Sequence, residues 1–210
     1  MNLDLRHRTA ATALVIVLLA TASDQGQKAP IPEHAKSGAA AGSIRSAADM
    51  IARWPERPRA LANMLLGKYG IPDEIVSSQL SWNDRLPWTK VVVFRDSASA
   101  GRSGHLLESV AYGKVPFDRW QDLTLLGRGA VYDPATQELS ARTDGEGTNL
   151  LALNMADEVI QGRRSVADAR RFYDATWNLS LNGKSSPYMS RLLFQPRSRT
   201  LPKLTGAGRT

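Results

Sequence analysis

His105 is the residue whose chemistry best suits acid–base or nucleophilic catalysis in this chain. An imidazole exchanges a proton near neutral pH, and Ser103 stands two positions before it. A Ser–His–Asp triad also needs an acid that orients the imidazole, and the sequence identifies no residue for that role. A metal site of His105 with carboxylates is a second interpretation, but no ligand spacing supports it. Catalysis at His105 is therefore an alternative only, and we predict no catalytic residue, no metal ligand and no cofactor.

The sequence lacks the residues or the complete motifs that several other kinds of site require. The chain has 210 residues and no cysteine, which excludes disulfides, thiolate zinc sites and cysteine nucleophiles. Residues 178–185 nearly match a phosphate-binding loop, but Asn178 replaces its first glycine and no strand is expected before it. Residues 127–129 and 145–147 each have only two glycines of a dinucleotide-binding motif, so we interpret both as turns.

Aromatic side chains are the other group that suggests a site. Five of them fall in the part of the chain expected to form a sheet: Trp82, Trp88, Tyr112, Trp120 and Tyr132. Aromatic rings on a strand face bind glycans or peptides by stacking, and they equally fill the core of a small domain. Both interpretations stay open. The candidate binding face consists of Trp82, Trp88, His105 and Tyr112.

The N-terminus has the pattern of a secretory signal peptide. Arg6 and Arg8 precede an uncharged stretch over residues 9–22 that ends in a small-x-small motif. Cleavage is predicted between Ala22 and Ser23, and residues 23–43, rich in Ala, Gly and Pro, are expected to form a flexible leader. The apolar stretch is shorter than the roughly 20 residues of a membrane-spanning helix. We therefore expect a periplasmic or secreted protein.

The positive charge is concentrated at the C-terminus. The formal net charge of the chain is +7, and residues 179–210 contain six Lys and Arg but no Asp or Glu. The body between the signal peptide and this region is neutral, which argues against nucleic acid as a partner. Residues 195–210 are expected to be a disordered basic tail that makes at most weak contact with an anionic surface.

Hydrophobic periodicity predicts a single α+β domain over residues 44–194. Its start has helical spacing, which indicates an N-terminal helical hairpin that ends before Gly70. Alternating and β-branched segments then predict a small antiparallel sheet, with strands over residues 76–82, 89–95, 105–113, 130–133 and 136–142. A short helix is expected over residues 116–126. Two C-terminal helices, over residues 148–161 and from 165 onward, are expected to pack on the sheet, the second through a face that includes Tyr173 and Trp177.

A set of short motifs resembles a family of uncharacterised bacterial exported proteins. The residues that carry the resemblance are Trp54-Pro55, Tyr69-Gly70, Pro72-Asp73, Trp82, Pro87-Trp88, residues 149–173, Ser186 to Met189, and Leu193-Phe194. The resemblance spans about residues 46–194. It implies a shared fold and export, and it assigns no activity and no catalytic residue.

These observations favour an exported, non-enzymatic binding or structural module of the bacterial cell envelope. Its partner would be an envelope component or another protein. The alternative is an enzyme of unknown class that acts on an extracytoplasmic substrate. A cleft that holds His105 with an orienting acid would favour the enzyme, whereas a flat, exposed His105 would favour binding.

Overall fold

The computed structural model describes residues 45–100 and 105–196 of the chain. A first helix covers residues 45–51. The elements that follow are α2 (Glu56–Tyr69), β1 (Glu74–Val76), β2 (Gln79–Arg85), β3 (Trp88–Phe94), β4 (Leu107–Tyr112), the 3-10 helix η2 (Phe117–Arg119), α3 (Trp120–Leu126), β5 (Ala130–Asp133), β6 (Glu138–Thr143), α4 (Glu146–Ile160), α5 (Val166–Leu181) and α6 (Pro187–Ser190).

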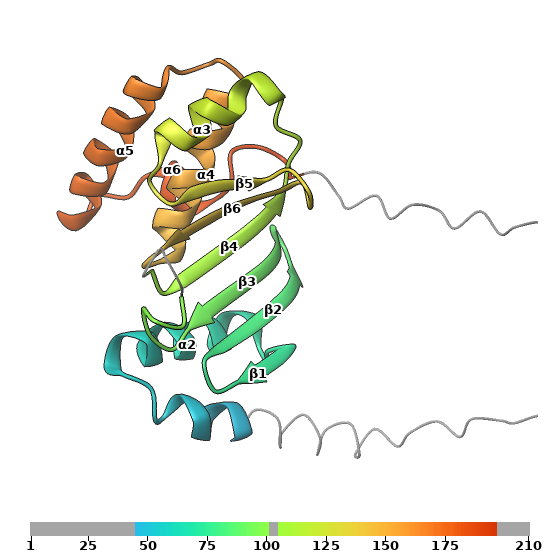
Figure 1. Cartoon of the computed structure of the whole chain (residues 1–210). Coiled ribbons are helices and arrows are strands. Elements are labelled where there is room, and N and C mark those ends of the chain that lie inside the picture. The colour runs from blue at the N-terminus through green and yellow to red at the C-terminus, as the bar shows by residue number, and fades with distance from the viewer. Residues whose placement is uncertain (1–44, 101–104, 197–210) are drawn as a thin grey trace, which may run out of the picture.

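The six strands form one antiparallel sheet in the order β1-β2-β3-β4-β6-β5 (Figure 1). The pairs Val91↔Ser109 and Ser109↔Ala141 align three neighbouring strands across the sheet. Since every pair is antiparallel and the helices lie outside the sheet, the predicted α+β class is confirmed.

The predicted strand over residues 76–82 is wrong in one respect. The chain reverses at Ser77-Ser78, so this segment is divided between β1 and β2, which pair with each other as a hairpin. The alternation of Val76, Leu80 and Trp82 suggested one continuous strand, but serine also favours tight turns. The backbone N–H of Arg95 donates to the carbonyl of Ser78 at 2.8 Å, which ties this turn to the end of β3.

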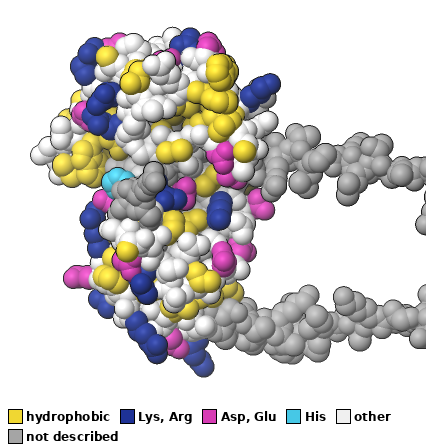
Figure 2. Space-filling model, viewed as in Figure 1, with side chains coloured by type: hydrophobic (Ala, Val, Ile, Leu, Met, Phe, Trp, Pro, Cys, Tyr) yellow, Lys and Arg dark blue, Asp and Glu magenta, His cyan; other side chains and the backbone are white. Residues whose placement is uncertain are grey.

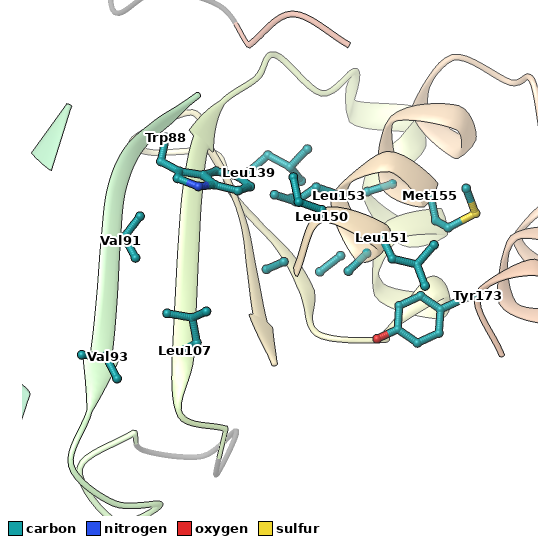
Figure 3. Close-up of a cluster of buried hydrophobic side chains, with 14 of the residues drawn as sticks. Trp88, Val91, Val93, Leu107, Leu139, Leu150, Leu151, Leu153, Met155 and Tyr173 are labelled. Carbon is teal, nitrogen blue, oxygen red and sulfur yellow. The ribbon is translucent and has the colours of Figure 1, made fainter. Parts of the chain in front are cut away.

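The core lies between the sheet and the helices that cover it (Figure 3). Val91 and Val93 of β3, Leu107 of β4 and Leu139 of β6 are nearly inaccessible to solvent. Helix α4 packs on β4, β5 and β6 and also contacts α3, α5 and α6, so most of its residues are buried. Helix α2 packs against β2 and β3. The connection from β6 to α4 therefore lies where sheet and helices meet.

Candidate functional site

A cavity of about 600 Å³ opens at the start of α4, and we call it the α4 cleft. Its walls come from α2, from His105 two positions before β4, from the turn between α3 and β5, from the β6–α4 connection, and from α5 and α6. Segments that are far apart in sequence therefore build one concave site.

One wall of the α4 cleft holds a histidine, an acid and an arginine in contact. Nδ1 of His105 lies 3.3 Å from Oδ1 of Asp144, and the guanidinium of Arg57 donates to Oδ2 of Asp144 at 2.9 Å. A carboxylate at Nδ1 favours the tautomer with the proton on that nitrogen, so the basic nitrogen of the neutral ring is Nε2. Asp144 is thus an acid in contact with His105, and the sequence did not identify it.

Arg128, which also lines the cleft, has an unfavourable backbone conformation. Its φ is +53°, in the left-handed region that non-glycine residues rarely adopt. The neighbouring Gly129 has φ +85°, and a Cβ there would lie 2.4 Å from the carbonyl oxygen of Arg142, so the turn requires glycine. This is the turn predicted over residues 127–129, and its role is to place Arg128 at the cleft.

The guanidinium of Arg128 is only partly satisfied by the protein. It donates to Asp174 at 2.5 Å and lies 5.8 Å from the ring centre of Tyr173. Its buried Nε has no hydrogen-bond partner among the described residues. An unmade hydrogen bond of this kind costs about 1–3 kcal/mol, and strain at a cleft residue is typical of a functional position.

Apolar and aromatic groups complete the cleft. Tyr173 and Trp177 come from successive turns of α5, and Met189 comes from α6. Trp177 keeps 39% of its surface exposed although its spacing on α5 predicted a buried position. The cleft thus offers an aromatic surface next to two arginines.

The floor of the cleft is a buried polar network around the start of α4. The hydroxyl of Thr143 lies 2.6 Å from that of Thr148 and donates to Asn149 Oδ1 at 2.6 Å. The amide of Asn149 in turn donates to Ser109 Oγ and the carbonyl of Leu107 on β4. These bonds fix the β6–α4 connection to the sheet, and with it the position of Asp144.

Glu146 anchors the same connection from the other side. Its Oε1 accepts from the Tyr69 hydroxyl at 2.5 Å and from the Trp88 indole at 3.0 Å, and its Oε2 accepts from Lys68 at 2.6 Å. Burial disfavours the charged carboxylate, but the three hydrogen bonds together outweigh it, so the pKa of Glu146 lies below its ordinary value. Burial and the nearby carboxylate raise the pKa of Tyr69 far above its ordinary value. We call these four side chains the Glu146 cluster.

The structure corrects the predicted aromatic binding face. Trp82 and Trp88 are 0% and 1% exposed, and their indoles donate inward, that of Trp82 to the carbonyl of Gly70 at 3.0 Å. They are core residues because α2 covers the strands that carry them. His105 lies in the α4 cleft, while the Tyr112 side chain, Ala22 and Ser23 fall outside the described part of the structure.

Sequence reasoning missed the other charged residues of the site. Arg57, Arg128 and Asp144 stand in three unrelated segments, and only the glycines around residues 128 and 146 marked two of these places. Within residues 45–100 and 105–196, no group of three or more His, Cys, Asp or Glu side chains is arranged to hold a metal ion. No helix in these ranges is long and apolar enough to cross a membrane.

The fold and site define an α+β protein with a mixed polar and aromatic cleft at the start of α4. No family model, no curated protein and no solved structure matches this chain.

Proposed function

We propose that this chain is an exported binding module of the bacterial cell envelope, whose α4 cleft takes a small molecule with an anionic group and a flat apolar part. The residues of the cleft support this: arginines for the anion, and Tyr173 and Trp177 for the ring. Each arginine already pairs with a carboxylate, but a guanidinium has five N–H donors and so retains capacity for a ligand. The observation that carries the proposal is Arg128, with its strained backbone and its unpartnered Nε.

Phenyl phosphate is a suitable probe because it combines one anionic group with one ring. We expect the chain to bind it in a calorimetric titration, and Arg128→Gln to weaken the affinity about tenfold through loss of charged hydrogen bonds. Arg171→Gln is the matched control, since Arg171 is an exposed arginine of α5 outside the cleft, and it should leave the affinity unchanged. Equal affinities of the wild type and Arg128→Gln would contradict the proposal.

The second candidate function is hydrolysis of such a ligand, and the His105–Asp144 pair specifically favours it. Nε2 of His105 would take a proton from water while the water oxygen bonds to phosphorus and the bond from phosphorus to the phenyl oxygen breaks. The electron pair of that bond leaves on the phenyl oxygen, and the phenoxide takes up a proton to give phenol. The mixture of the chain and phenyl phosphate from the calorimetric titration distinguishes the two functions, because it can be assayed for phenol. Release of phenol that is lost in His105→Gln would identify an enzyme, and binding without release would identify a binding module.

Export forms part of the same proposal, together with membership of the uncharacterised exported family. The supporting observations are the signal pattern of residues 1–22 and the resemblance over residues 46–194. We expect the protein recovered from the periplasm or medium to begin at Ser23 by N-terminal sequencing. Protein that begins at Met1 and stays in the cytosol would contradict export.

A protein or envelope partner is proposed rather than nucleic acid. Basic and acidic side chains are interspersed on the face of the molecule that Figure 2 shows, without a broad basic area on that face. Exposed apolar side chains near α3 and β5, namely Phe117, Leu125 and Val131, suit a protein contact.

Two finer expectations also belong to the proposal. The first is that the N-terminal helices form one hairpin and that two C-terminal helices pack on the sheet. The second is that the basic tail, residues 195–210, contacts an anionic surface.

A further inference from the structure

A second cavity, of about 360 Å³, lies beside the first helix, and we call it the Trp54 cavity. Its walls come from helix 45–51 and the turn after it, from the β1–β2 turn at Ser77, and from Arg95 after β3. It shares no lining residue with the α4 cleft. The two sites are therefore separate, and ligand binding in the Trp54 cavity does not depend on the function proposed for the α4 cleft.

The indole of Trp54 is the first sign that this cavity takes a ligand. Trp54 is only 3% exposed, yet its Nε1–H has no hydrogen-bond partner in the described parts of the chain. The indoles of Trp82, Trp88 and Trp120 all donate to a protein oxygen. A buried donor without an acceptor is rare in native structures, so an acceptor is expected from outside the described residues.

Two opposite charges at the same cavity are the second sign. Asp49 and Arg53 are one helical turn apart and both line the cavity, but within residues 45–100 and 105–196 neither forms an ion pair. Arg95 also lines it, and its Nε donates to Asp96 at 2.7 Å. The lining of the cavity thus holds two guanidinium groups, one carboxylate and the Trp54 ring with its buried indole N–H.

We propose that the Trp54 cavity binds a small zwitterion, of the class of free α-amino acids. The ligand carboxylate would accept hydrogen bonds from Arg53, Arg95 and the Trp54 indole, because guanidinium groups match carboxylate geometry. The ligand ammonium would pair with Asp49. Met50 and the Trp54 ring supply the apolar part of the wall for a side chain. An anion alone would leave Asp49 as a repulsive neighbour, which is why a zwitterion fits better.

Indole N–H signals in a proton–nitrogen NMR spectrum of the full-length chain provide the test. The chain has five tryptophans, and Trp54→Phe assigns the Trp54 signal by its disappearance while keeping a ring in the core. Titration with L-methionine is expected to shift this signal in a saturable manner. Acetate, which lacks the ammonium group, should bind at least about tenfold more weakly.

Two exposed-residue variants separate the two halves of the ligand. Arg53→Gln and Asp49→Asn should each weaken L-methionine binding about tenfold, whereas Arg171→Gln should have no effect. No shift of the Trp54 signal at millimolar L-methionine would overturn the proposal. Acetate binding as tight as L-methionine binding, with Asp49→Asn without effect, would overturn it as well, since the site would then be a simple anion site.

Discussion

Replacing Trp88 with alanine is expected to lower the free energy of unfolding by about 3–5 kcal/mol, the range for large aromatic residues truncated in a core. Trp88 is 1% exposed and packs in the main hydrophobic cluster at the start of β3. Its indole also donates to Glu146 and to the hydroxyl of Tyr69, each at 3.0 Å. The substitution removes both the packing and these two bonds. Urea unfolding at neutral pH measures the change.

Trp177→Ala is the matched control for this prediction. Trp177 is also a tryptophan of the domain, but 39% of it is exposed, and it lines the α4 cleft. We expect its loss to change the unfolding free energy by less than about 1.5 kcal/mol, because much of the ring already contacts water. Trp88→Phe should fall between the two, since it keeps one aromatic ring in the core but loses part of the buried volume and both hydrogen bonds. Equal losses for Trp88→Ala and Trp177→Ala would contradict the assignment of Trp88 to the core.

Trp88 and Trp177 also show which features could be predicted from the sequence and which could not. Alternation over residues 76–82 and the β-branched run of residues 89–95 both indicated strands of an antiparallel sheet, although the first segment is divided between β1 and β2. Whether Trp88 faces solvent or core depends on α2, which precedes it by about twenty residues and covers its strand. Helical spacing likewise placed Trp177 with the buried residues of α5, but no element covers it completely. The burial of a side chain depends on which other elements pack over it, and the hydrophobic periodicity of its own segment does not show this.

The same limit applies to the candidate site. His105 was the foremost chemical residue in the sequence, and the structure brings it to a cleft with an acid. Its partner Asp144 is 39 positions away, and the arginine on the same carboxylate is 87 positions from it. Pairing of β4 with β6 brings the first two together, through the register Leu107↔Thr143 next to them. Without the strand order, no spacing rule could have connected these residues.

Glu146→Gln is expected to lower the free energy of unfolding by about 2–3 kcal/mol at neutral pH, the range for hydrogen bonds to a charged group. The carboxylate is only 15% exposed and accepts from three side chains, so a neutral amide cannot replace it. An amide nitrogen would face the ammonium group of Lys68, donor against donor. Lys68→Gln is the control, since Lys68 is 51% exposed and its ion pair should contribute less than about 1 kcal/mol.

The stabilisation by Glu146 should also depend on pH with a definite sign. Because the folded pKa of Glu146 lies below the ordinary value of 4.5, its contribution is complete above pH 4.5. The contribution is lost as the pH falls through the folded pKa, where the carboxylate takes up a proton in both states. Urea unfolding at several pH values should therefore show the wild type and Glu146→Gln converging below pH 4.5. A difference that grew on acidification would mean that the buried group is a neutral acid, and that burial outweighs the three donors of the Glu146 cluster.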